Sequence, residues 1–123
     1  MSRAALVVDD STTMQEMVSF TLGKAGFAVT RAGNGQEALG RLQGGKFDLI
    51  ITDLNMPIMD GITLITKLRA LPEYRFTPIM MLTTESQDEK KVAGKRAGAT
   101  GWIVKPFDPA RLINVVKMVC PPG

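Results

Sequence analysis

The feature that most constrains this fold is the regular alternation of short apolar runs with longer amphipathic segments. Five runs have the length and composition of buried strands, and each is followed by a segment whose apolar residues recur at helical spacing. The expected strands are Ala4–Val8, Phe27–Ala32, Asp48–Thr52, Pro78–Thr83 and Gly101–Lys105. This alternation predicts an α/β fold, in which a parallel sheet is covered by helices on both faces.

Residues suited to helix N-caps precede four of the amphipathic segments. These residues are Asn34, Asp60, Ser86 and Asp108. The helix expected after Ser86 is unusual, because its apolar face consists only of Val92, Ala93 and Ala97. It also contains Gly94, which costs about 1 kcal/mol relative to alanine inside a helix. We therefore expect this helix to be weakly anchored.

Length and composition limit the class of protein. The 123 residues fill one ordinary domain and leave no room for a second. The net charge of +3 comes from 15 basic and 12 acidic residues, an excess too small to predict nucleic-acid binding. No apolar run is long enough to span a membrane, and Asp9-Asp10 comes too early for a signal peptide. We therefore expect a cytoplasmic protein that binds neither nucleic acid nor membranes.

The cysteine and histidine content excludes several kinds of chemistry. The single cysteine, Cys120, cannot form an internal disulfide, and its neighbours Pro121-Pro122-Gly123 suggest a frayed end. The chain contains no histidine. Histidine-ligated metal sites and nucleophiles activated by histidine are therefore excluded.

Polar residues follow four of the expected strands. They are Asp9-Asp10, Asp53, Thr83-Thr84 and Lys105-Pro106. A single aspartate at a strand end is most often a turn or cap residue. However, parallel strands bring their carboxyl ends to one edge of the sheet, which is where such sheets bind ligands. We therefore expect these side chains to meet.

Three carboxylates that lie close together repel one another and require a cation. A site made only of oxygen atoms, with few protein ligands, favours Mg²⁺. A metal ion with Lys105 opposite it would form a receptor for a phosphoryl group. One carboxylate can then act as the nucleophile and become an aspartyl phosphate.

These residues, at these spacings, resemble the receiver domains of bacterial two-component response regulators. The segments ITDLNMPIMDG, MLTTESQ and GATGWIVKPF are similar to those of single-domain chemotaxis regulators of the CheY type. The resemblance covers essentially the whole chain. It implies a doubly wound, flavodoxin-like sheet with strand order 2-1-3-4-5, of which CheY is a known example. It also implies that residues 1–123 form one receiver domain without a separate output domain.

The resemblance further implies the roles of the acidic residues. Asp53 would accept a phosphoryl group from a phosphohistidine of a chemotaxis-type sensor kinase. Asp10 and Asp53 would bind Mg²⁺ together with the backbone carbonyl of Asn55, and Asp9 would act mainly through a water molecule. Asn55 and Glu85 occupy the positions that tune self-dephosphorylation.

The remaining site residues are also assigned from the resemblance. Lys105 would pair with the phosphoryl group, the Thr83 hydroxyl would move to bond it, and Thr84 would border the path of the attacking water. The Lys105–Pro106 peptide bond is expected to be cis. Trp102 falls on the aromatic switch position. Since side chains alternate along a strand, Ile103 should point into the core and Trp102 toward the fourth helix.

The resemblance implies a phosphorylation-activated switch that catalyses only its own phosphorylation and dephosphorylation. The expected output surface combines the fourth helix, the fifth strand and the fifth helix, and includes Lys90, Lys91, Lys95 and Trp102. Candidate partners of the expected monomer are the kinase, a flagellar motor switch protein and a phosphatase.

Two other functions fit parts of the pattern. The protein could drain phosphoryl groups from the same kinase, as a phosphate sink. A haloacid-dehalogenase-type phosphatase also uses an aspartate nucleophile, Mg²⁺, a hydroxyl and a lysine. That class places an aspartate as general acid two residues after the nucleophile, where this chain has Asn55, and an amide cannot transfer a proton.

Overall fold

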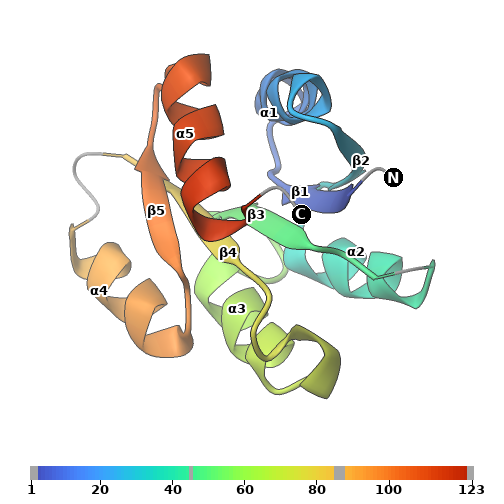
Figure 1. Cartoon of the computed structure of the whole chain (residues 1–123). Helices are drawn as coiled ribbons and strands as arrows, with labels where there is room; N and C mark the ends of the chain where they lie inside the picture. The colour runs from blue at the N-terminus through green and yellow to red at the C-terminus, as the bar shows by residue number, and fades with distance from the viewer. Residues whose placement is uncertain (1–2, 45, 85–87, 122–123) are drawn as a thin grey trace.

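The computed structural model describes residues 3–44, 46–84 and 88–121, and over these ranges strands and helices alternate as expected (Figure 1). The strands are β1 (Arg3–Val8), β2 (Phe27–Ala32), β3 (Leu49–Asp53), β4 (Ile79–Thr83) and β5 (Gly101–Val104). The α-helices are α1 (Thr12–Lys24), α2 (Gly35–Arg41), α3 (Gly61–Arg69), α4 (Asp88–Ala97) and α5 (Pro109–Val119). Short 3₁₀ helices follow α2 at Leu42–Gly44 and α3 at Pro72–Tyr74.

The sheet is parallel throughout, with strand order β2-β1-β3-β4-β5. Helices α1 and α5 cover one face, and α2, α3 and α4 cover the other (Figure 1). The expected fold class and strand order are therefore confirmed. All five strands end at the same edge of the sheet, so the residues that follow them are neighbours.

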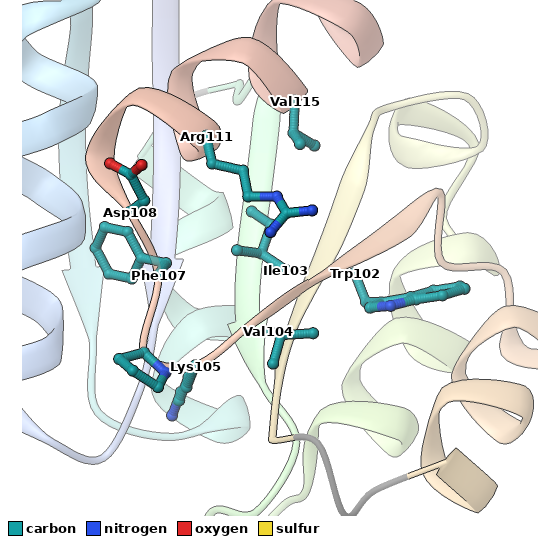
Figure 2. A pocket seen from close by; sticks show the side chains of 9 residues that line it. Trp102, Ile103, Val104, Lys105, Phe107, Asp108, Arg111 and Val115 are labelled. Atoms are coloured by element: carbon teal, nitrogen blue, oxygen red, sulfur yellow. The ribbon is translucent and has the colours of Figure 1, made fainter.

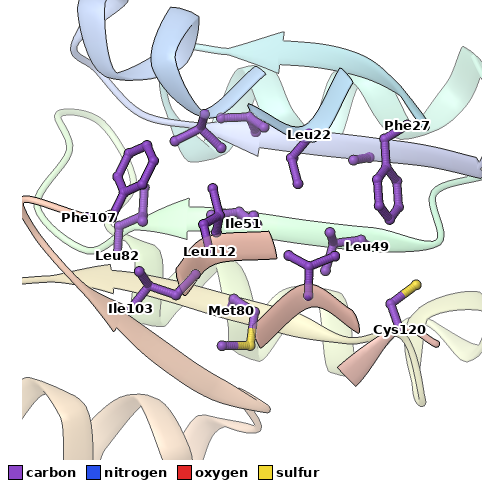
Figure 3. Close-up of a cluster of buried hydrophobic side chains, with 14 residues drawn as sticks. Leu22, Phe27, Leu49, Ile51, Met80, Leu82, Ile103, Phe107, Leu112 and Cys120 are labelled. Carbon is purple, nitrogen blue, oxygen red and sulfur yellow. The ribbon is translucent and has the colours of Figure 1, made fainter. Parts of the chain in front are cut away.

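Each face of the sheet has its own hydrophobic core, because successive side chains of a strand point to opposite faces. On the face covered by α1 and α5, Leu22, Leu112 and Val116 pack with Ile51 of β3 (Figure 3). On the opposite face, Ile50 of β3 belongs to the core formed with α2 and α3. Both cores extend to the carboxyl edge, where Leu54 and Phe107 lie close in sequence to the polar residues.

The end of the chain near Cys120 is not frayed, which corrects the expectation from its proline-rich neighbours. Cys120 is buried, and Arg3 of β1 donates to its backbone oxygen at 2.7 Å and to its Sγ at 3.0 Å. The Arg3 guanidinium also lies 4.8 Å from the ring centroid of Phe27. Burial raises the pKa of the Cys120 thiol, so the thiol is not an activated nucleophile.

Helix α4 approaches the sheet through a glycine. Gly94 is the one buried residue of α4, all of whose residues are described, and a Cβ atom there would lie 2.0 Å from Sδ of Met81. The glycine thus permits close packing that a larger residue would prevent. The C-terminal end of the helix is held by Arg69 of α3, whose Nε donates to the Gly98 carbonyl oxygen at 2.9 Å. The anchoring of α4 is therefore concentrated at Gly94 and at this end.

Gly94 and Gly40, which both lie inside helices, should respond oppositely to replacement by alanine. Gly94→Ala should lower the free energy of unfolding by about 1–3 kcal/mol, because the new methyl group collides with Met81. Gly40→Ala in α2 meets nothing within 4 Å and should raise it by up to about 1 kcal/mol. Urea denaturation of both variants measures the two changes. Changes of the same sign would contradict the packing role of Gly94.

Candidate functional site

Three carboxylates gather at the carboxyl edge of the sheet. Asp53 is the last residue of β3, and Asp9-Asp10 directly follows β1, its neighbour in the sheet. One oxygen of each of the three side chains lies within 4.8 Å of the others. Asp9 is fully buried, Asp53 is 8% exposed, and Asp10 faces solvent. The cluster predicted from the strand ends therefore forms, with one open side.

Lys105, which follows β5, brings the opposing charge. Its Nζ lies 3.3 Å from Oδ2 of Asp9 and 3.2 Å from Oδ1 of Asp53. Its backbone N–H donates to the carbonyl oxygen of Thr83 at 2.6 Å, and the Lys105–Pro106 peptide bond is cis. One ammonium group thus contacts two of the three carboxylates.

Backbone donors offset more of the negative charge. The N–H of Ser11 donates to Oδ1 of Asp9, and the N–H of Leu54 donates to Oδ1 of Asp53, both at 2.9 Å. Even so, burial raises the pKa of Asp9, and the nearby Asp53 carboxylate raises it further. The Ser11 N–H and Lys105 act in the opposite direction. The free site therefore holds negative charge at a net electrostatic cost.

Gly61 shapes the loop that follows Asp53, and the sequence analysis did not identify it. A Cβ atom at Gly61 would lie 2.2 Å from the backbone oxygen of Asp53, and its N–H donates to the Leu54 carbonyl at 2.9 Å. One feature of the sequence could have indicated this role. Gly61 directly follows Asp60, the N-cap of α3, and glycine is an unfavourable residue within a helix. The close approach fixes the backbone under the acidic cluster.

The residues assigned to switching lie on β4 and β5 or directly after them. The Thr83 hydroxyl is fully buried and has no hydrogen-bond partner among the described residues, whereas Thr84 is exposed. Ile103 points into the core, as the strand alternation predicted, and Trp102 is 42% exposed. The Lys91 ammonium lies 5.8 Å from the centroid of the Trp102 ring. Trp102 therefore lies against α4. Glu85 lies outside the described residues.

The three lysines of α4 do not share one environment. Nζ of Lys90 donates to Oδ1 of Asn55, at the rim of the acidic site. Lys91 lies beside Trp102, and Nζ of Lys95 donates to the Thr100 carbonyl at 3.1 Å. Lys90 therefore belongs to the rim of the site, while the other two lie nearer β5.

A groove of about 450 Å³ lies between β5 and α5, beside Lys105 (Figure 2). Its lining includes Trp102, Val104, Val115, Arg111 and Asp108, so it combines apolar surface with charges of both signs. This groove adjoins the surface on which Lys91 contacts Trp102. The expected output surface thus contains an open recess.

The parallel sheet, the acidic edge and the opposing lysine define a receiver. Residues 5–117 match the family model of the response regulator receiver domain, and the chain belongs to this family. Within the family it is similar to chemotaxis regulators of the CheY type, as expected from the sequence.

Individual relatives agree with this grouping. The chain is 43% identical to the chemotaxis protein CheY-3 of Vibrio cholerae over 108 residues, covering 87% of this chain and 83% of that protein. The solved chemotaxis response regulator CheY4 of Vibrio cholerae is 48% identical, with a TM-score of 0.91 over 97% of this chain and 99% of that one. A putative response regulator of Chloroflexus aurantiacus J-10-fl is 37% identical, with a TM-score of 0.94 over 99% and 100% of the two chains.

Within the described ranges, no helix combines the length and the apolar character that crossing a bilayer requires.

Replacing the buried carboxylate of Asp9 by an amide should stabilise the metal-free protein. The raised pKa means that the folded state holds the Asp9 proton more tightly than the unfolded chain does, so the ionised form costs stability at neutral pH. Asp9→Asn should therefore raise the free energy of unfolding by about 1 kcal/mol at pH 7. The gain should shrink as the pH falls through the raised pKa. Urea denaturation of both proteins across this range, without divalent cations, provides the measurement. A less stable variant at pH 7 would contradict this electrostatic account.

Proposed function

We propose that the protein is a signalling switch that a histidine kinase activates by phosphorylating Asp53. Receiver domains accept phosphoryl groups from histidine kinases. In the transfer, a carboxylate oxygen of Asp53 bonds to phosphorus while the bond from phosphorus to the histidine nitrogen breaks, and that nitrogen keeps the electron pair. The observation that carries the proposal is the placement of Asp53, which contacts Lys105 and lies within the acidic cluster. These 123 residues contain no histidine, so the phosphoryl donor lies outside them.

The acidic residues fit a magnesium ion. Three carboxylate oxygens lie within 4.8 Å of one another, and oxygen atoms are the ligands that Mg²⁺ prefers. Asp10, Asp53 and the backbone carbonyl of Asn55 would hold the ion, and Asp9, which already bonds Ser11 and Lys105, would act through a water molecule. The bound ion would supply positive charge opposite Lys105. Asp53 then becomes a less repulsive target for an anionic donor.

The Thr83 hydroxyl provides a physical reason for a change of conformation on phosphorylation. A buried hydroxyl without a partner is costly, and a phosphoryl oxygen on Asp53 would provide an acceptor for it. Bonds made by Thr83 and Lys105 in only one arrangement would shift the equilibrium between two conformations. Thr84 and Glu85 follow Thr83 directly, and we assign them, with Asn55, to tuning of dephosphorylation. Trp102 would respond because β5 lies next to β4.

The proposed output is binding of a protein to the surface formed by α4, β5 and α5. Lys91, Lys95 and Trp102 lie on it, next to the groove that contains Arg111. Lys90, at the rim of the site, borders this surface. As in chemotaxis regulators, we place the protein in the cytoplasm, with a flagellar motor switch protein and a phosphatase as candidate partners. A phosphate sink would share the phosphorylation chemistry and would bind no motor protein, so a pull-down with that protein separates the two.

Asp53→Asn should abolish phosphorylation while the fold is retained. The amide cannot act as the nucleophile, so labelling by acetyl phosphate with Mg²⁺ should fall to background, a loss of at least about 100-fold. Hydroxylamine-sensitive labelling of the purified protein provides the measurement. Asp88→Asn, on the exposed start of α4, is the matched control and should label normally. Persistent labelling of Asp53→Asn would assign the nucleophile elsewhere.

Trp102 should become more buried when the site is loaded. Movement of the Thr83 side chain toward Asp53 would free space near β5, so beryllofluoride with Mg²⁺ should reduce acrylamide quenching of this single tryptophan. Thr83→Ala should weaken the change and still permit phosphorylation. Thr21→Ala, a buried threonine of α1, is the control and should respond like the wild type. Equal quenching in loaded and free wild-type protein would show that coupling does not pass through Trp102.

A further inference from the structure

Ile58, in the loop between β3 and α3, has an unfavourable backbone conformation. Its φ is +70°, the one positive value among the described residues other than glycine. The N–H of Met59 donates to the carbonyl of Pro57 at 2.7 Å, which closes a three-residue turn around Ile58. A turn of this kind with a positive central φ is rare and strained. A positive φ is especially unfavourable for a β-branched residue, whereas asparagine and glycine adopt positive φ values more readily.

Burial within the chain does not offset this strain. The Ile58 side chain is 75% exposed, so an apolar residue in a strained turn also faces solvent. The surrounding contacts hold it there. Met59 packs so tightly on Gly35 that a Cβ atom at Gly35 would lie 2.9 Å from its Sδ, and Gly61 fixes the end of the loop below Asp53. Strain that surrounding structure enforces beside a reactive group is commonly tied to function.

The position of the loop indicates what covers Ile58. Asp53 is 8% exposed, so a phosphorus atom must come close to the sheet edge to reach its carboxylate. The loop that starts at Leu54 directly follows Asp53, so a protein that carries this phosphorus can contact the loop during transfer. Residues 54–59 carry no charge, whereas Lys90 lies at the rim on the α4 side. The loop thus offers an apolar contact to a protein donor. A small phosphodonor reaches Asp53 without that contact.

We propose that Ile58 is an apolar docking contact for the phosphohistidine-bearing kinase protein that delivers the phosphoryl group to Asp53. The inference rests on the proposed function, because it names a determinant of recognition at the same site. Ile58 contacts the protein partner and takes no part in bonding to phosphorus. It therefore affects transfer from a protein donor and leaves transfer from a small molecule unchanged.

The test compares two donors across three variants. Ile58→Asn suits the turn and removes the apolar contact, Ile58→Leu keeps an apolar side chain, and Phe76→Asn removes another exposed apolar residue, from the loop before β4. The donors are acetyl phosphate and each autophosphorylated chemotaxis kinase encoded in the source genome. Ile58→Asn should raise the urea midpoint of unfolding and react with acetyl phosphate within twofold of wild type. Its kcat/KM with the kinase that phosphorylates the wild type should fall about tenfold. Ile58→Leu and Phe76→Asn should retain kinase transfer within about twofold to threefold.

Several outcomes would overturn the inference. Wild-type transfer from the kinase to Ile58→Asn would show that the side chain is not a contact. Equal slowing with both donors would place the effect at the acceptor site instead of the docking surface, and equal slowing in Phe76→Asn would make it nonspecific. Failure of every donor to label the wild type would instead overturn the proposed function. The two failures are therefore distinguishable.

Discussion

Electrostatic repulsion among three carboxylates determines how the rest of the site is built. One oxygen of each side chain lies within 4.8 Å of the others, and the low polarity of a partly buried edge strengthens their interaction. Lys105 and the N–H groups of Ser11 and Leu54 reduce the repulsion, but the pKa of Asp9 remains raised. Such a site favours a divalent cation, and with the cation in place it can accept an anion. Bound ligands would thus complete the charge balance of the site.

Close backbone packing keeps these charges in place. Without a Cβ atom at Gly61, the start of α3 can lie against the Asp53 carbonyl, and the Gly61 N–H bonds the Leu54 carbonyl oxygen beside the acidic cluster. Gly94 does the same for α4 by making room for Met81 of β4. Met81 is paired with Trp102 in the sheet, so α4 rests on the strand residue next to the tryptophan. The same packing principle therefore fixes the reactive site and positions the proposed output surface.

The sequence predicted most of the fold because its signals are local. Apolar alternation located the strands to within about a residue, and the residues after the strands predicted the acidic edge. The strand order was inferred from family resemblance alone, because periodicity carries no information about which strands are neighbours. The burial of Cys120, the steric role of Gly61 and the positive φ of Ile58 were not predicted. Each depends on contacts between segments that a single sequence does not reveal.

A backbone hydrogen bond joins Thr83 to Lys105, so the path from the acidic site to Trp102 is short. Thr83 carries a buried hydroxyl with no hydrogen-bond partner in the described part of the chain. Its carbonyl accepts the N–H of Lys105, whose ammonium contacts Asp53. Any rearrangement that gives this hydroxyl a partner at Asp53 therefore acts on the junction between β4 and β5. Trp102 lies on β5, three residues before Lys105, and closely packed elements change between discrete arrangements instead of deforming freely. A small displacement at Thr83 can therefore reach the α4–β5 surface without a long chain of intermediates.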